Sequence, residues 1–391
     1  MKKILNIIFF MLAGALFGKD VDIPDHLFCQ EEDSQLMVES GKRLWSYFQA
    51  LKEERKKKFF IANEWDPLRV VIVGGANPEP NPKYPLPKGT EEEVAGLIKI
   101  LEERGIKVYH YNEFPNAKAA DVCTLFPRDP LVIIEDCVIE CAMRPGRRQE
   151  GGIMRNELLL KVLEQGQKYI PMPAPQKPLN NTVYDDRDES DCVITGGSIL
   201  IGDNQLYVGS TIETRPSRLL WGWKKASQGL QYVLPKNRLE SMTKFLEKRR
   251  TYTYSSKPVI EWLEKLLPLL DKSYTIHEIQ FKQSQKIFDL DQCLSLVRPG
   301  LGIICKDLLL SEVPKPLQSW DLIEITEEEV KTNGGNILIL DESTVVIDER
   351  NERIVQELEK RGITVIKVPF AKVGTKLGGL RCWHQPLLRR K

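Results

Sequence analysis

One pattern of glycines, apolar runs and a polar turn occurs at two widely separated places in the chain. Residues 195–208 read TGGSILIGDNQLYV and residues 333–346 read NGGNILILDESTVV, so that the glycine pair, an Ile-Leu-Ile triplet, an aspartate and a final valine coincide. Two short apolar runs around a polar turn are typical of a strand hairpin. Repeats of one such unit pack on one another rather than folding alone. The repetition therefore predicts a single closed domain.

The complete unit is a hairpin, a helix and a further strand, and we find about five copies of it. In the last copy, the helical stretch RNERIVQELEKRG and the strand ITVIKVPF follow the hairpin. Stacking around an axis predicts an α/β fold, with the proline-rich segment 171–191 as a surface connection. The copies lie near residues 68–111, 130–172, 196–234, 293–325 and 336–369.

The N-terminal residues have the pattern of a targeting segment. Residues 1–18, MKKILNIIFFMLAGALFG, contain two lysines, an apolar run and the small-residue site Ala13-Gly14-Ala15. This predicts a signal peptide cleaved near Ala15 and export to the periplasm or outside the cell; the alternative is a buried helix in a cytoplasmic protein. Residues 19–62 form a charged extension whose KEERKKK run favours a solvated helix face. The main domain is expected at 63–391.

The composition excludes some partners. The chain has 56 basic and 55 acidic residues, so its net charge of +1 creates no field that attracts nucleic acid or anionic lipid. A small molecule is the expected partner, no stable membrane span is expected after signal removal, and a homodimer stays open. The eight cysteines lack the spacing of a disulfide framework or zinc site. We therefore expect free thiols and no metal.

Five motifs follow one another along the chain: NEWDPLRVVIVG at 63–74, FPRDPLVII at 126–134, GGSILIGD at 196–203, FDLDQCLSLVRPGLGI at 288–303 and GGLRCW at 378–383. Their order resembles that of the guanidino-group-modifying superfamily, glycine amidinotransferase most closely and arginine deiminase more distantly. The resemblance covers about residues 60–391 and implies a five-bladed α/β propeller with its reactive centre in a central channel, without metal or organic cofactor.

The resemblance assigns roles to individual residues. Cys382 matches the family cysteine, which attacks the guanidinium carbon of arginine, forms an amidino-thiouronium, releases ornithine and passes the amidino group to an amine. Asp129 and Asp291 match the carboxylates that bind the guanidinium, with Arg128 beside them. A planar cation that only donates hydrogen bonds suits paired carboxylates. Without the resemblance, Cys382 would be a buried thiol and Asp129 a surface turn residue.

Two departures from the family pattern concern catalysis. In the family, the fourth motif is His-x-Asp, whereas this chain has Asp289 in place of the general acid/base histidine. The family also has acidic residues on both sides of the glycine pair, where this chain has Thr195 and Ser198. Asp289 is therefore the candidate catalytic carboxyl. His384 is an alternative, because residues two apart share a face in an extended segment with Cys382.

These features predict an amidinotransferase-like protein that transfers an amidino group from arginine to an amine through Cys382. Glycine is disfavoured as the acceptor, because the family's cation for the acceptor carboxylate falls at Leu308, with Lys306 nearby. The alternative is a pseudoenzyme that binds a guanidino compound or a partner, because Asp289 replaces the histidine. Hydrolysis of a guanidino compound is a third possibility.

Overall fold

A computed structural model describes nine stretches of the chain. The chain divides into two compact units, Met1–Lys58 and Phe59–Lys391, and nearly all described residues belong to the second. The expected signal peptide, the extension up to residue 57 and most of the proline-rich segment lie outside the described residues. These are 58–75, 87–114, 125–143, 147–173, 192–211, 235–248, 256–282, 287–374 and 378–390.

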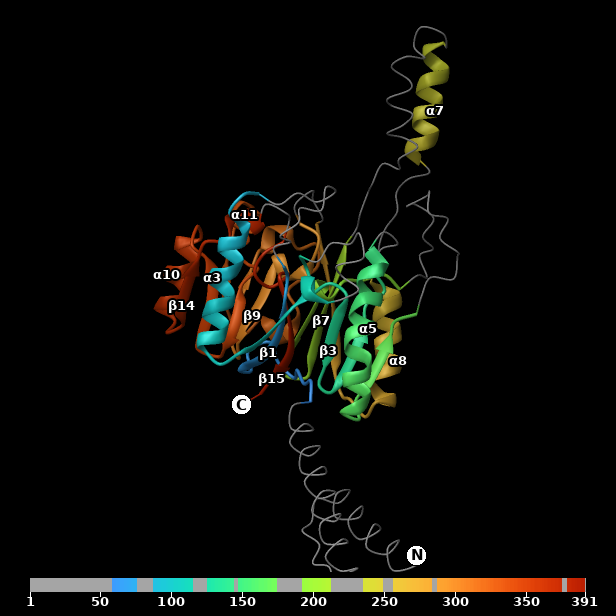
Figure 1. Cartoon of the computed structure of the whole chain (residues 1–391). Coiled ribbons are helices and arrows are strands. Elements are labelled where there is room, and N and C mark those ends of the chain that lie inside the picture. Colours follow the sequence, from blue (N-terminus) through green and yellow to red (C-terminus); the bar gives the residue numbers. More distant parts are fainter. Residues whose placement is uncertain are drawn as a thin grey trace, which may run out of the picture. The chain divides into compact units, whose positions relative to one another are not determined.

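Five three-stranded sheets share one topology. In each sheet the first two strands are antiparallel and the third is parallel to the second (Figure 1). The sheets are β15–β1–β2 (His384–Arg389, Leu68–Val73, Lys107–His110), β3–β4–β5 (Leu131–Ile134, Cys137–Glu140, Lys168–Pro171), β6–β7–β8 (Ile199–Gly202, Gln205–Thr211, Thr275–Phe281), β9–β10–β11 (Leu294–Arg298, Leu301–Ile304, Asp321–Glu324) and β12–β13–β14 (Leu338–Asp341, Thr344–Asp348, Thr364–Val368).

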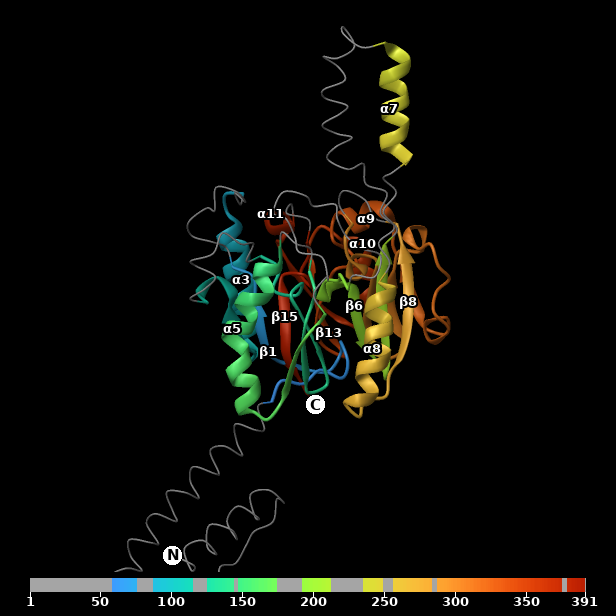
Figure 2. The same cartoon turned by 90° about the vertical axis from the view of Figure 1, so that its right-hand side faces the viewer.

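Helices make the crossovers that parallel strands require. In four blades a helix joins the second strand to the third, and these helices lie on the outside of the ring (Figure 2). They are α3 (Thr90–Glu103), α5 (Arg148–Glu164), α8 (Lys257–Leu269) and α10 (Glu352–Lys360). The fourth blade makes its crossover with two 3-10 turns, Lys306–Leu308 and Lys315–Leu317. The other described helices are α7 (Lys236–Lys248), α9 (Glu327–Lys331) and α11 (Ala371–Gly374).

Burial gives the radial order of the strands. The first strands β3, β6, β9 and β15 are almost wholly buried, whereas the third strands β2, β5 and β14 are largely exposed or half-buried. The first strands therefore line the axis. Three apolar clusters each cross between sheets: Ile139 and Val208 share one, Leu296 and Ile347 another, and Val71 and Val346 the third. The predicted five-bladed α/β propeller is confirmed.

The first blade joins the two ends of the unit. Its antiparallel strand pair consists of β1 and β15, which are about 310 residues apart in the sequence. The expected repeat at 68–111 therefore contains only two of the three strands of this blade. Residues before 63 also belong to the ring, because Phe60 pairs with Leu388 and Ile61 pairs with Glu135. The strand pairing between chain ends closes the ring.

The expected third repeat, 196–234, ends too early. Its third strand is β8 at Thr275–Phe281, and its crossover helix is α8. The expected end at residue 234 falls inside a long insertion between β7 and α8. The segment 212–234 lies outside the described residues.

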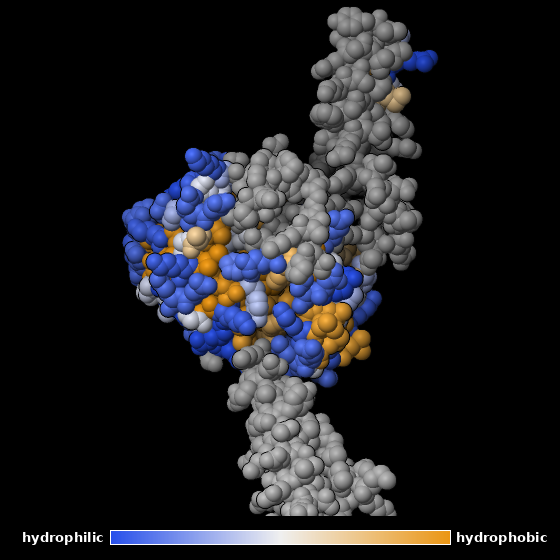
Figure 3. Space-filling view, viewed as in Figure 1, coloured by the Kyte–Doolittle hydropathy of each residue, from blue (hydrophilic) through white to orange (hydrophobic). Residues whose placement is uncertain are grey.

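Beside an apolar area at the centre left, the surface view (Figure 3) shows a second one at the lower right. It covers the lower ends of α5 and α8 (Figure 3), the helices that carry the exposed side chains of Leu160, Leu163 and Leu269. None of the described helices is both long enough and apolar enough to cross a bilayer.

We expect Ile72→Ala in β1 and Ile347→Ala in β13 to lower the midpoint of one shared unfolding transition. Both side chains are fully buried in different clusters, and each substitution should cost about 2–5 kcal/mol. Calorimetry of the full chain is the measurement, with Leu160→Ala at an exposed position as the control. Two transitions, each moved by only one substitution, would contradict a single ring.

Candidate active site

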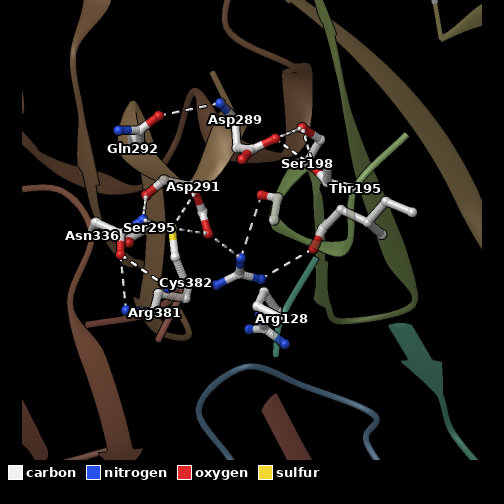
Figure 4. Close-up of polar contacts among 12 residues, drawn as sticks. Arg128, Thr195, Ser198, Asp289, Asp291, Gln292, Ser295, Asn336, Arg381 and Cys382 are labelled. Atoms are coloured by element: carbon white, nitrogen blue, oxygen red, sulfur yellow. Dashed lines mark hydrogen bonds and ion pairs between the residues drawn. The ribbon is translucent and has the colours of Figure 1, made fainter. Parts of the chain in front are cut away.

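The site is built from the turns that precede the five first strands. Because all blades share one topology, these turns meet at the same end of the axis (Figure 4). Direct contacts join them: the Gly196 amide donates to the Asp129 carbonyl at 2.8 Å, and the Asn336 side chain donates to the Asp291 carbonyl at 3.2 Å. The turns are residues 126–130, 195–198, 289–293, 333–337 and 379–383.

Glycine is required where two of these turns touch their neighbours. A Cβ atom on Gly196 would lie 2.2 Å from the carbonyl oxygens of Arg128 and Leu131. A Cβ on Gly379 would lie 2.6 Å from Oδ1 of Asn336. Neither backbone nor a clamped amide can move away easily, so the paired glycines of both motifs permit the close approach of adjacent blades.

A buried ion-pair network underlies the site. The Arg381 guanidinium donates to Glu64 Oε1 at 2.7 Å and to Asp291 Oδ2 at 2.9 Å, and Arg128 donates to Glu64 Oε2 at 3.1 Å. Burial acts to raise the pKa of Glu64, but Arg381 and Arg128 outweigh it and lower that pKa to about 2. Arg128, predicted to bind substrate, is thus held in an internal pair. Its pKa falls to about 10 through burial and the charge of Arg381.

The Cys382 sulfur lies among groups from three blades. Sγ receives a hydrogen bond from Asn336 Nδ2 at 3.2 Å and lies 3.6 and 3.7 Å from the two carboxylate oxygens of Asp291. Asn336 Oδ1 accepts the backbone N–H groups of Arg381 and Cys382 at 2.8 and 3.2 Å. Asn336 therefore fixes both the turn and its sulfur.

Sequence reasoning missed Asn336, although a signal was present. Asn336 ends NGGN at the position that Ser198 holds in TGGS, so the internal repeat itself points to a second residue beside the axis.

Three carboxylates surround Cys382. Burial, followed by the charges of Asp291, Asp129 and Asp289, raises the pKa of the thiol well above its ordinary value. Burial also raises the pKa of Asp291 to about 6, with Arg381 opposing it and Asp289 adding to it. The structure thus brings the predicted residues Cys382, Asp129, Asp289 and Asp291 together. These charges favour the protonated thiol of Cys382.

The three positions that depart from the family pattern are in contact with one another. The Thr195 and Ser198 hydroxyls both donate to Oδ1 of Asp289, the second of them at 2.9 Å. A carboxylate accepts hydrogen bonds, and hydroxyl groups can supply them. Asp289, which stands where the family has a histidine, thus accepts hydrogen bonds from Thr195 and Ser198, which stand where the family has acidic residues. The three replacements therefore fit one another. Asp291, rather than Asp289, is the carboxyl within reach of the Cys382 sulfur.

Asp129 lies in the turn before β3 and is buried. Its Oδ2 accepts Nη1 of Arg147 at 2.6 Å, whereas its Oδ1 has no hydrogen-bond partner among the described residues. Burial raises the pKa of Asp129 to about 7; Arg147 lowers it, while Asp289 and Glu150 raise it further. One oxygen of Asp129 is thus available to a ligand.

The histidines described by the structure do not replace the missing base. His384 begins β15, and its Nδ1 lies 2.7 Å from the Leu380 carbonyl oxygen. Burial and Arg128 lower its pKa far below the ordinary value. His277 is bound to Gln205 on the third blade. Within the described stretches no hydrogen bond joins a histidine to Cys382, and no group of three or more His, Cys, Asp or Glu side chains is arranged to hold a metal.

We expect Asn336→Asp to slow alkylation of Cys382 by iodoacetamide about tenfold at pH 9, equivalent to about one unit of thiol pKa. The variant keeps the acceptor oxygen, loses the N–H donor to sulfur and adds a negative charge. Peptide mass spectrometry measures the rate. Gln167→Glu, the same amide-to-carboxylate change at a buried side chain that is bound to Phe59 and Asp136, is the matched control. An unchanged rate in Asn336→Asp would show that the amide does not act on the sulfur.

Comparison with known proteins agrees with the motif order. A family model described as arginine deiminase matches residues 316–389. The mitochondrial glycine amidinotransferase of Xenopus laevis is 22% identical over 378 residues, covering 84% of this chain and 82% of the relative. An uncharacterized protein, YkgA, of Bacillus subtilis is 29% identical over 128 residues, covering 32% of this chain and 43% of the relative.

Solved structures show the same fold. An amidinotransferase of the saxitoxin biosynthetic pathway from Microseira wollei has a TM-score of 0.59 and 20% identity, covering 85% of this chain and 98% of that chain. The inosamine-phosphate amidinotransferase of Streptomyces griseus also has a TM-score of 0.59, with 18% identity and coverage of 85% and 97%. The sequence relatives and the family model support an amidinotransferase-like, guanidino-modifying family for this chain, and the solved structures show that it shares their fold.

Proposed function

We propose that the protein captures the guanidinium group of arginine at the axis of the ring and transfers its amidino group to an amine through Cys382. The observation that carries this proposal is the position of Asp291 at 3.6 Å from the Cys382 sulfur, with Asp129 close enough to raise the pKa of the thiol and with Oδ1 of Asp129 unpartnered among the described residues. An anionic, largely water-excluded position beside a thiol suits a planar cation with an electrophilic carbon.

Ligand binding would also activate the nucleophile. Burial and three carboxylates favour the protonated Cys382 thiol. A guanidinium bound to these carboxylates offsets their charge, and a nearby cation favours thiolate. Asp291 lies 3.6 Å from Sγ and has a pKa of about 6, so it can take the thiol proton near neutral pH.

Cys382, the substrate and the acceptor amine account for every bond that forms or breaks in the transfer. The sulfur forms a bond to the guanidinium carbon, the bond from that carbon to the ornithine nitrogen breaks, and the departing amine takes up one proton. An acceptor amine then attacks the same carbon, loses a proton and releases Cys382. Asp291 is within reach to pass the thiol proton to the departing amine and then to take the proton that the acceptor amine loses, which returns to Cys382. Asp289, the residue expected for this role, is held by two hydroxyl groups instead.

A second candidate function is binding of a guanidino compound without turnover. One observation favours it: Asp291 already binds an internal guanidinium, that of Arg381, at 2.9 Å. The absence of a hydrogen bond between Cys382 and a described histidine fits the same view. Such a protein would keep the ligand affinity but would transfer nothing.

Incubation with arginine should add the mass of one amidino group to the intact protein, and peptide mapping should locate it on Cys382. Cys382→Ala should abolish the adduct, whereas Cys137→Ala, at another buried thiol in β4, should retain it. Loss of the adduct on addition of a primary amine supports transfer. Arginine binding without any adduct or ornithine release would favour the second candidate.

Asp129→Asn should weaken arginine binding by about thirtyfold or more, because loss of one partner of a buried charged pair costs about 2–5 kcal/mol.

Binding requires ionised carboxylates, so the wild-type affinity should fall as the pH drops through about 7 for Asp129 and about 6 for Asp291. Calorimetry from pH 5 to 8 measures both effects, with Asp348→Asn, a buried aspartate paired with Arg350, as the control. Equal affinity for Asp129→Asn at every pH would remove Asp129 from the binding site.

A further inference from the structure

Arg147 contacts Asp129 from a fixed position. It lies just before α5, and its Nε and Nη2 donate to the two oxygens of Glu150 at 2.7 and 2.6 Å. A two-point pair of this kind orients the guanidinium as well as binding it. The remaining nitrogen, Nη1, is thereby directed at Oδ2 of Asp129, at 2.6 Å.

The two carboxylate oxygens of Asp129 therefore differ in their hydrogen bonding among the described residues. Oδ2 is occupied by Arg147, while Oδ1 is buried and has no partner among the residues that the structure describes. A buried, unpaired acceptor is costly unless something fills it. Because Glu150 holds Arg147, the free acceptor is Oδ1, on the carboxylate that belongs to the turn facing the axis.

Arg147 opposes the surrounding groups that favour the protonated form of Asp129. Asp129 is approached by Glu150 on α5, by Asp289 in the turn before β9, and by the thiols of Cys141 and Cys382, with Arg128 adjacent in sequence. Glu150 and Asp289 favour the protonated carboxyl, as burial does. Arg147 is the cation with the largest opposing effect on Asp129.

We propose that Arg147, clamped by Glu150, is a positioning residue that keeps Asp129 ionised and leaves its Oδ1 for the ligand guanidinium. Arg147 then sets the lowest pH at which the site accepts its ligand, and it stays in place when the ligand binds. The inference rests on the proposed function for the identity of the ligand. The charge state of Asp129 does not depend on that function.

The test is a pH profile of arginine affinity for the wild type and three variants. Between about pH 7 and pH 6, where Asp129 is the carboxyl that takes up a proton, affinity should fall about tenfold per pH unit, as for one required deprotonation. Arg147→Gln should move the midpoint upward by about one unit or more, weaken binding at pH 7 by about fivefold or more, and recover towards the wild type by pH 9. Arg147→Lys, which keeps the charge, should have a midpoint nearer the wild type.

Arg155→Gln is the matched control. Arg155 is on the same helix and forms the same two-point pair, with Glu140 at 2.8 and 2.5 Å, but it does not contact Asp129. Its midpoint should equal that of the wild type. A purely structural role for Arg147 predicts weaker binding by the same factor at every pH, which would overturn the proposal. Tighter binding by Arg147→Gln at pH 7 would also overturn it, because Arg147 would then be a competitor of the ligand.

A ligand-free measurement separates this inference from the proposed function. Infrared titration of the carboxyl band, as the difference between each protein and its Asp129→Asn counterpart, reports Asp129 directly. The midpoint should be higher in Arg147→Gln than in the wild type. If arginine does not bind but this shift is found, the function fails and the role of Arg147 stands; no shift would refute the role of Arg147.

Discussion

The guanidinium of Arg381 is the contact on which the site depends most. It joins Glu64, which lies before the first blade, to Asp291 before β9, and it donates to the Ile199 carbonyl at 3.1 Å. The next residue is Cys382, so the position of the sulfur follows from the position of this arginine. A buried charge is expensive unless it is paired. Removing Glu64 or Asp291 would therefore leave a cation without its partner beside the nucleophile.

Much of the fold could be predicted from the sequence, because the blade is a local unit. The apolar strands, the Glu135-Asp136 turn and the amphipathic helices α3 and α10 are each visible in a short window of residues. Two features could not be predicted in this way. The pairing of β1 with β15 joins opposite ends of the unit, and the strand β8 follows a long insertion. Neither leaves a local signal.

The site, too, could be predicted from the sequence only in part. The identities of Cys382, Asp129, Asp289 and Asp291 follow from the motifs, and one topology repeated around an axis explains why they meet. The hydrogen-bond partners do not follow from the motifs. Asn336 reaches the sulfur from another blade, and Arg147 reaches Asp129 from the start of α5. Such contacts depend on side-chain direction across blades, which the spacing along the chain does not contain.

Electrostatics connects the scaffold to the proposed chemistry. Each buried arginine of the site already has a carboxylate partner, yet Asp289 is bound by hydroxyl groups and Oδ1 of Asp129 is unpartnered within the described part of the chain. This imbalance supports the proposed cationic ligand. Under the proposed function, the replacement of a histidine by Asp289 changes which group handles the protons and leaves the guanidinium site in place.

A crystal structure of Cys382→Ala with arginine would decide whether the anionic position beside Cys382 is a guanidinium site. We expect the guanidinium to donate to Oδ1 of Asp129, with its carbon about 3–3.5 Å from the place of the wild-type sulfur. Arg147 should remain on Oδ2 and on Glu150. Failure of arginine to bind at the axis, or arginine bound away from Asp129, would rule this site out.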